Sequence, residues 1–127
     1  MVRHGLSFDI ECYYQIVAKD YLRERLAPTS EVVRNTSFIL DCLGEAGVKA
    51  TFFTLGNVAR AFPQLIRRIV EEGHELAVHG DEHLYLTDLD PAAFREELAR
   101  AIGALEDAGG VRITGHRAPA FSLVERT

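Results

Sequence analysis

The sequence has 127 residues, of which 47% are hydrophobic and 26% are charged, and its formal net charge is −5. This size and composition fit one globular domain with its own hydrophobic core, so we treat residues 1–127 as a single domain. The acidic balance disfavours nucleic acid and anionic membranes as partners, and the lack of a long apolar run or a secretory leader predicts a cytoplasmic protein.

The first third of the chain is predicted to form a strand, a loop and a helix. Residues Gly5–Glu11 alternate apolar and polar side chains, which is typical of a strand. Cys12–Leu26 is poorly periodic and is expected to be a loop with one helical turn. Residues 28–30 offer a break and a capping hydroxyl for a helix whose apolar positions run over Val32–Leu43, and Gly47 is placed to end it.

The remaining elements alternate between strands and helices. Lys49–Leu55 is rich in β-formers and resembles a strand buried on both faces, and Pro63–Glu72 has helical spacing of apolar residues. Asp90-Pro91 marks the start of an amphipathic helix that Gly109-Gly110 stops. Two further short strands are predicted at Glu75–Val78 and about Arg112–His116. This order predicts an α/β fold with about four parallel strands joined by right-handed crossovers.

Polar residues follow the predicted strands at the ends where parallel α/β folds bind ligands. Two histidines four residues apart, His79 and His83, come after the third predicted strand, and on a helical turn they would share one face. Such a pair can hold one cation, with a third ligand from near the amino terminus. The other residues expected at this edge are Asp9, Glu11, Asn57 and Arg117.

Several other polar residues and both cysteines are expected to have structural or solvent-facing roles rather than functional ones. His74 and His116 are expected to be structural, and Asp81 and Glu82 to face solvent. The two cysteines fit neither a metal pair nor a disulfide framework, so we expect reduced thiols, with Cys42 buried.

Four segments together resemble successive motifs of the polysaccharide deacetylases that carry the NodB homology domain. The resemblance runs from about Leu6 to Ser122, and the most similar branch is found in exopolysaccharide and O-antigen biosynthesis loci. The segments are Ser7-Phe8-Asp9-Ile10-Glu11, Thr51-Phe52-Phe53, Gly73-His74-Glu75 with His79-Gly80 and His83, and Arg117-Ala118-Pro119-Ala120-Phe121-Ser122. This resemblance implies a distorted (β/α) barrel and removal of N-acetyl groups from a sugar or polysaccharide.

The resemblance also assigns roles to individual residues. It implies that His79, His83 and Glu11 bind a divalent metal, that Asp9 is the general base, and that Arg117 orients Asp9, although Asp9 and Glu11 could exchange roles. Two imidazoles and a carboxylate leave a position open for water, as in catalytic zinc sites, although cobalt, nickel or manganese would also fit. The resemblance further places the substrate and the oxyanion at Pro119, Ala120 and Phe121, with the Ala120 backbone N–H as a donor.

The family is usually about twice this length, so the resemblance implies the N-terminal part of such a domain. The general-acid histidine of the family's C-terminal part has no counterpart here, which makes activity of this chain alone doubtful. Open sheet edges are expected to favour self-association. Two alternatives remain at this point: hydrolysis of another C–N bond, as in allantoinase-like relatives, and a truncated, non-catalytic metal-binding or assembly module.

Overall fold

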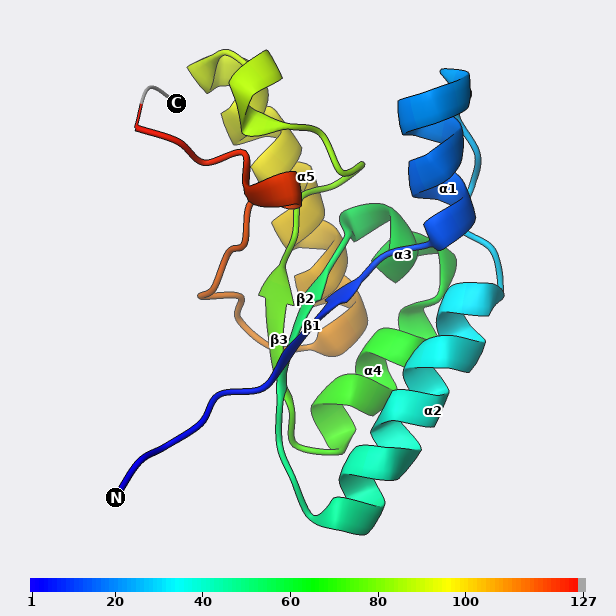
Figure 1. Cartoon of the computed structure of the whole chain (residues 1–127), viewed down its shortest axis with the longest axis vertical. Coiled ribbons are helices and arrows are strands. Elements are labelled where there is room, and N and C mark those ends of the chain that lie inside the picture. The colour runs from blue at the N-terminus through cyan, green and yellow to red at the C-terminus, as the bar shows by residue number, and fades with distance from the viewer. Residues whose placement is uncertain (126–127) are drawn as a thin grey trace.

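A computed structural model describes residues 1–125 of the chain and shows a small parallel sheet with helices packed against it (Figure 1). The strands are β1 (Ser7–Ile10), β2 (Thr51–Thr54) and β3 (Glu75–Val78), in the order β1-β2-β3. Ser7 lies opposite Thr51, which in turn lies opposite Glu75, so the three strands are in parallel register. Their carboxyl ends therefore meet at one edge of the sheet.

Helices connect these strands, as expected for parallel pairs. They are α1 (Tyr13–Val17), which continues into a wider helical turn over Ala18–Leu22, α2 (Glu31–Ala46), α3 (Gly56–Ala61), α4 (Pro63–Glu71) and α5 (Pro91–Gly109), with 3₁₀ turns at Leu86–Asp88 and Pro119–Phe121. The expected ends of the longest helices are confirmed. Gly47 ends α2 in a left-handed conformation (φ 65°), and the Asp90 carboxylate accepts a hydrogen bond of 2.8 Å from the Ala93 N–H at the start of α5.

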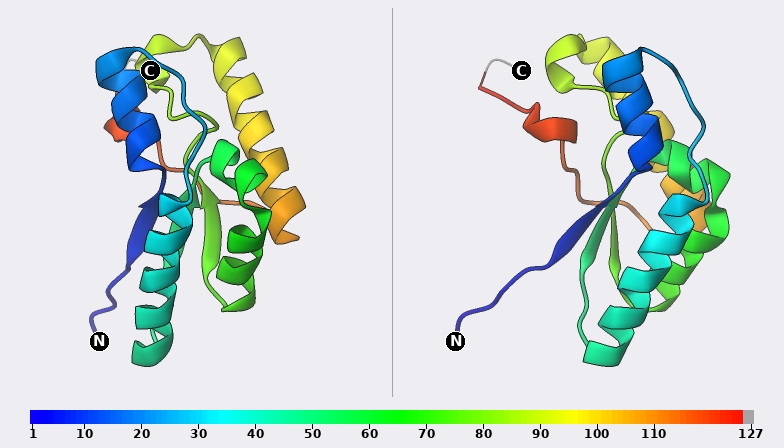
Figure 2. Two further views of the ribbon diagram at one scale, coloured as in Figure 1. Left: turned by 90° about the vertical axis from the view of Figure 1, so that its right-hand side faces the viewer. Right: turned by 45° about the vertical axis from the view of Figure 1, so that its right-hand side comes forward.

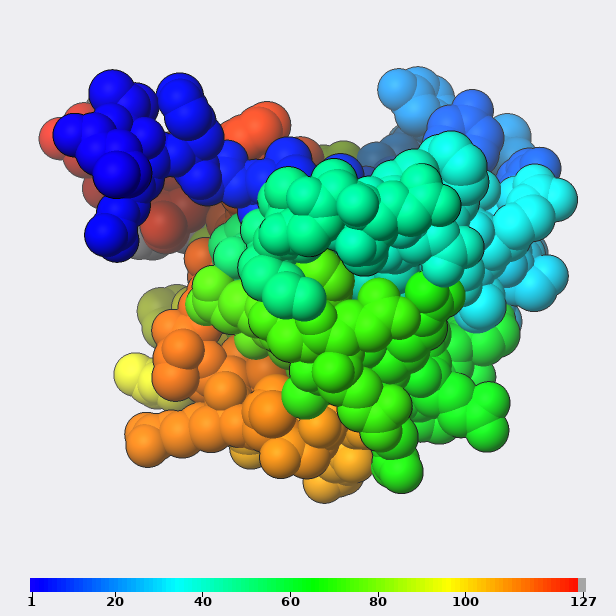
Figure 3. Space-filling view, turned by 90° about the horizontal axis from the view of Figure 1, so that it is seen from below, coloured from blue at the N-terminus to red at the C-terminus, as the bar shows by residue number. Residues whose placement is uncertain are grey.

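The hydrophobic core lies between the sheet and the helix layer, and Figure 2 shows helices along one side of the strands. Phe52 of β2 is fully buried there, together with Leu40 of α2, Ile66 of α4 and Leu105 of α5. Seen from below, the ends of α2, α4 and α5 lie next to one another at the amino end of the sheet (Figure 3). This core fixes the sheet and leaves its carboxyl edge free for chemistry.

Two predictions about the elements were wrong, and one helix was missed. The segment Cys12–Leu26 contains a helix rather than mainly a loop, and helix α3 was not predicted at all. The predicted fourth strand is reduced to one isolated bridge between Val78 and His116. That segment makes only two backbone hydrogen bonds with Val78, from the Val78 N–H to Gly115 and from the Arg117 N–H to Val78, which is too little pairing for a strand.

The cysteines and the predicted helix cap also differ from expectation. Cys42 is exposed, whereas Cys12 is buried. The hydroxyl oxygen of Thr29 lies 3.3 Å from the Cys12 sulfur, and Ser30 makes no side-chain capping hydrogen bond at the start of α2. The predicted capping hydrogen bond is therefore absent at Ser30, and the neighbouring Thr29 hydroxyl contacts a thiol.

Strand β1 lies at an edge of the sheet, because within residues 1–125 it pairs with β2 alone. No helix in that part of the chain is both long and apolar enough to cross a bilayer.

Candidate metal centre

Three of the predicted site residues converge at the carboxyl edge of the sheet. Glu11 follows β1, while His79 and His83 follow β3. The Glu11 Oε2 atom lies 3.3 Å from His79 Nε2 and 3.1 Å from His83 Nε2, and one ligand atom from each residue lies within 4.8 Å of the others. Within residues 1–125, no other group of three acidic, histidine or cysteine side chains is this close.

The donor atoms fit a divalent cation. His79 Nδ1 lies 2.8 Å from the carbonyl oxygen of Arg117. A carbonyl oxygen only accepts, so Nδ1 carries the hydrogen and Nε2, which is directed at Glu11, is the atom free to bind a cation. Glu11 Oε2 is buried and has no hydrogen-bond partner among the described residues. A nitrogen, nitrogen and oxygen set with an unsatisfied anionic oxygen is typical of zinc sites.

Without a cation, the histidines and the carboxylate stabilise each other. Burial raises the pKa of Glu11, but the close approach and the charges of the His79 and His83 rings outweigh it and lower the pKa to about 2. Burial lowers the pKa of His79, but its close contact with Glu11, its hydrogen bond to the Arg117 carbonyl and the charges of Asp9 and Glu11 raise it above its usual value. A cation must displace this proton, so we expect metal uptake to release protons.

Asp9 lies beside these three residues and is held by Arg117. Its Oδ2 atom is 3.7 Å from His79 Nε2, whereas its Oδ1 atom accepts a 2.7 Å hydrogen bond from Arg117 Nη1. Arg117 also donates to Ser7 Oγ at 2.8 Å and lies 4.1 Å from the centre of the Phe53 ring. Of the two acids, Glu11 is thus in closer contact with the histidines, and Asp9 is aligned by an arginine.

Ser7 and Phe53 were not identified from the sequence as part of this arrangement. A signal was available for Ser7, because it precedes Asp9 by two residues and so shares its face of β1. Asn57, expected at the same edge, is the second residue of α3 and has a buried Oδ1 atom without a partner among the described residues.

The turn Pro119–Phe121 follows Arg117 and has an unusual backbone. Ala120 (φ 49°) and Phe121 (φ 54°) both adopt left-handed conformations, which are uncommon for residues other than glycine and cluster at functional sites. Ser122 Oγ donates to the Pro119 carbonyl at 2.6 Å and accepts from the Leu86 N–H at 2.9 Å. The turn is therefore fixed to the loop that follows His83.

The expectation that Asp81 faces solvent was wrong. Asp81 is 2% exposed, and both of its carboxylate oxygens accept hydrogen bonds from Arg60 of α3, at 2.7 and 2.9 Å. Its backbone N–H donates to the carboxylate of Glu97, a buried residue of α5. Burial raises the pKa of Glu97, and the hydrogen bonds from the turn oppose that rise. Glu97 could have been noticed from its place between Phe94 and Ala101 at helical spacing.

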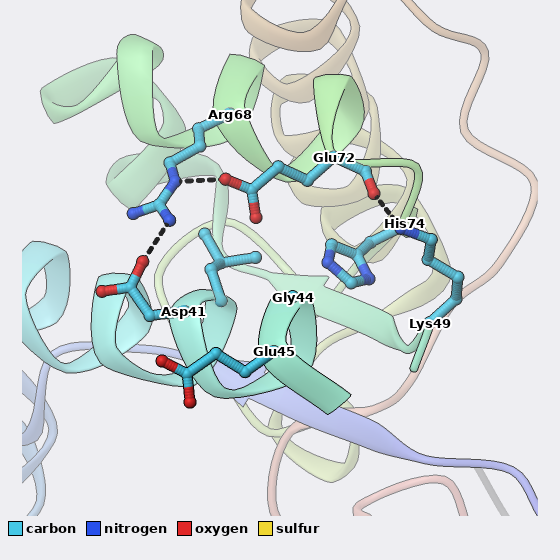
Figure 4. Close-up of a pocket in the computed structure, with 8 residues that line it drawn as sticks. Asp41, Gly44, Glu45, Lys49, Arg68, Glu72 and His74 are labelled. Carbon is cyan, nitrogen blue, oxygen red and sulfur yellow. Dashed lines mark hydrogen bonds and ion pairs between the residues drawn. The ribbon is translucent and has the colours of Figure 1, made fainter. Parts of the chain in front are cut away.

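A hollow of about 490 Å³ lies at the amino end of the strands, away from the candidate metal centre (Figure 4). Most of its charged side chains are already engaged: Arg68 contacts Glu72 and Asp41, and Lys49 donates to the Glu72 backbone carbonyl. His74 accepts a hydrogen bond from the Ala50 N–H, which supports its expected structural role. The chemistry is therefore expected at the carboxyl edge.

Comparison with known proteins identifies a family for the chain. Residues 27–127 match the family described as polysaccharide deacetylase. The chain belongs to this family. The resemblance read from the sequence motifs is thereby confirmed, as is the α/β fold class. The family match itself begins after Asp9, which lies in β1, and after Glu11, which follows it.

Individual polysaccharide deacetylases are similar over most of the chain. A chitooligosaccharide deacetylase of Bradyrhizobium sp. is 40% identical over 85 residues, which cover 66% of this chain and 39% of the relative. A peptidoglycan-N-acetylglucosamine deacetylase of Bacillus cereus is 29% identical and covers 91% of this chain and 43% of its own length. A crystal structure described as a polysaccharide deacetylase from Mycobacterium smegmatis has a TM-score of 0.77 and 33% identity, over 91% of this chain and 42% of that one. The chain thus spans less than half the length of these relatives.

Proposed function

We propose that this chain is the metal-binding part of a hydrolase that removes N-acetyl groups from an N-acetylated carbohydrate. The observation that carries the proposal is the convergence of Glu11, His79 and His83, with a buried carboxylate oxygen that lacks a hydrogen-bond partner. The names of the relatives, which specify chitooligosaccharide and peptidoglycan-N-acetylglucosamine deacetylases, favour a polymer containing N-acetylglucosamine as the substrate.

The ion that suits this donor set best is Zn²⁺, although Co²⁺, Ni²⁺ and Mn²⁺ also accept two imidazoles and a carboxylate. When bound, such a cation supplies Lewis-acid activation of the amide carbonyl and of water. His79 and His83 would hold it from one side, and Glu11, directly after β1, would neutralise part of its charge. The three residues follow two strands, β1 and β3, whose positions the sheet fixes through β2.

Asp9 is proposed as the general base. It lies outside the tight three-residue set, so its carboxylate can accept the proton of the attacking water. The hydrogen bond from Arg117 keeps this carboxylate oriented, and Ser7 and the Phe53 ring hold the guanidinium in place.

The turn Pro119–Phe121 is proposed to contact the acetyl group. A backbone N–H from Ala120 would donate to the oxygen that gains negative charge as the amide is attacked. The left-handed backbone of Ala120 and Phe121 and the hydrogen bonds of Ser122 support a turn with a defined direction.

Metal content and acetate release together test the proposal. Wild-type protein, His79→Ala and the control His4→Ala, whose histidine is exposed, are exchanged into zinc, desalted and measured by elemental analysis, then incubated with N-acetylglucosamine oligomers. We expect about one equivalent of zinc for the wild type and the control, with slow acetate release because the chain offers no general-acid histidine, and neither zinc nor acetate for His79→Ala.

The outcomes separate the alternatives. Less than about a tenth of an equivalent of metal in the wild type would end the proposal of a metal centre. Zinc binding without acetate release would favour the non-catalytic module. Equal acetate release by wild type and His79→Ala would remove the catalytic assignment.

A further inference from the structure

The turn between the two histidine ligands is tied to helix α5 by one buried carboxylate. Glu97 is 3% exposed, and its Oε1 atom accepts hydrogen bonds from the backbone N–H groups of Asp81, at 2.5 Å, and Glu82, at 3.3 Å. Two successive N–H groups that converge on one anionic oxygen make a strong anchor for a turn.

We infer that Glu97 is a positioning residue for the candidate metal centre, holding the turn that carries His83 in the geometry that lets both histidines face Glu11. This inference rests on the proposed function, in which His79 and His83 act as ligands. Glu97 itself contacts no ligand atom, and acts through the backbone of residues 81 and 82.

His83 depends on the backbone for its direction more than His79 does. The ring of His79 is oriented by the Arg117 carbonyl through Nδ1. The corresponding Nδ1 atom of His83 is buried and has no hydrogen-bond partner among the described residues. Metal-binding histidines usually have such a second contact, so at His83 the turn must supply the orientation.

The turn also has a conformation that it would not hold by itself. Gly80 has φ 90° and His83 has φ 56°, so left-handed residues lie on both sides of the two N–H groups that Glu97 accepts. Such backbone persists where the surrounding structure determines it. A carboxylate at this position compensates for the strain because it pairs with both N–H groups at once.

The surroundings show that this contact is built into the fold. A Cβ atom on Gly80 would lie 3.0 Å from Glu97 Oε1, so glycine permits the close approach of the carboxylate. The Gly80 and Asp81 carbonyls accept hydrogen bonds from the N–H groups of Gly56 and Asn57 at the start of α3. The turn is thus held by α3 on one side and by Glu97 of α5 on the other.

A test needs variants that separate positioning from general stability. Glu97→Leu removes both acceptor oxygens, and Glu97→Gln keeps the shape and an acceptor but loses the charge. Glu96→Leu and Glu96→Gln are matched controls, because Glu96 is the exposed neighbour on the same helix. Leu105→Ala, at a fully buried position of α5, is a control that lowers stability without touching the turn.

Two measurements are made on the chain and each variant. Amide hydrogen exchange of Asp81 and Glu82 is followed in the metal-free protein, and the zinc dissociation constant is measured by competition with a chromophoric chelator. We expect Glu97→Leu to speed exchange at both amides and to weaken zinc binding about 10- to 100-fold, as for other residues that orient ligands. Glu97→Gln should fall between Glu97→Leu and the wild type, and the Glu96 variants should match the wild type.

The inference is overturned if the Glu97 variants keep wild-type exchange and zinc affinity, or if Leu105→Ala weakens zinc as strongly as they do. Should Glu97→Leu fail to fold, the comparison of Glu97→Gln with Glu96→Gln decides. If the wild type binds no zinc, the proposed function fails, and the exchange of the two amides still decides whether Glu97 holds the turn.

Discussion

Removing one partner of the Asp81–Arg60 ion pair should destabilise the fold by an amount that depends on which partner is removed. The Asp81 side chain is 3% exposed, whereas that of Arg60 is 47% exposed. Arg60→Met leaves a buried carboxylate without its main counter-charge. In Asp81→Asn, the Arg60 side chain can rotate toward solvent. The new amide oxygen can still accept one hydrogen bond from Arg60.

The expected magnitudes follow from this difference in burial. Loss of one partner of a buried pair costs about 3–5 kcal/mol. Because Arg100 Nε remains 3.7 Å from Asp81 Oδ2, we place Arg60→Met near the lower end, at about 3 kcal/mol. Asp81→Asn loses only part of two charge-assisted hydrogen bonds, and we expect a cost of about 1–2 kcal/mol.

Urea denaturation of the metal-free proteins at pH 7 measures both costs. Arg67→Met is the control, because Arg67 is exposed on the neighbouring helix α4, and it should change stability by less than about 0.5 kcal/mol. The slopes of the transitions must agree for the comparison to hold. Equal costs for the two substitutions, or a larger cost for Asp81→Asn, would refute the reasoning.

Four further predictions concern the metal centre and the sheet edge. In the metal-free protein, wild type should exceed Glu11→Gln in stability above pH 4.5, and this advantage should shrink as the pH falls toward 2, because the folded pKa of Glu11 is lowered from 4.5 to about 2. The stability advantage of the wild type should also shrink as the pH rises above 6.5 and through the raised pKa of His79, where that ring loses its charge. Urea denaturation curves of both proteins across this pH range check these two trends. A stability difference that does not change with pH contradicts them. Zinc at a hundred times its dissociation constant should raise the unfolding free energy by about 2.7 kcal/mol in the wild type, as seen in urea titrations with and without chelator, and should have little effect on His83→Ala. Asp9→Asn should slow deacetylation about 10²- to 10⁴-fold in an acetate assay while zinc affinity stays within a few fold; loss of zinc would make Asp9 a ligand instead. The open edge of β1 should cause self-association, which light scattering detects, and a monomer at micromolar concentration would count against it.

Features set by local physics could be predicted from the sequence. The helix that begins at Asp90 and the helix that Gly47 ends depend on capping and on left-handed glycine, which act within a few residues. The pair His79 and His83 was recognisable because it follows an apolar strand directly. The parallel order of strands then placed Glu11 near this pair without any knowledge of contacts.

Features set by distant contacts could not be predicted in this way. Asp81 looked like a surface charge because its partner Arg60 lies on α3, a six-residue helix that begins with glycine and was not recognised. The role of Glu97 was not recognised for a related reason. Its partners are backbone N–H groups, which every residue except proline has and which no sequence pattern therefore indicates. Cys42 was misjudged because apolar spacing does not show which cysteine faces a neighbouring segment.

Strand β1, which carries Asp9 and leads directly into Glu11, borders only β2 within residues 1–125. A slip of one residue in its pairing would send Asp9 to the opposite face of the sheet and move the chain that leads to Glu11. A cation shared by Glu11 and the two imidazoles would cross-link the first strand to the segment after the third, bypassing β2. Cation binding would then stabilise the correct register of this edge strand. Removal of the cation by a chelator should increase the mobility of β1 before that of the rest of the sheet.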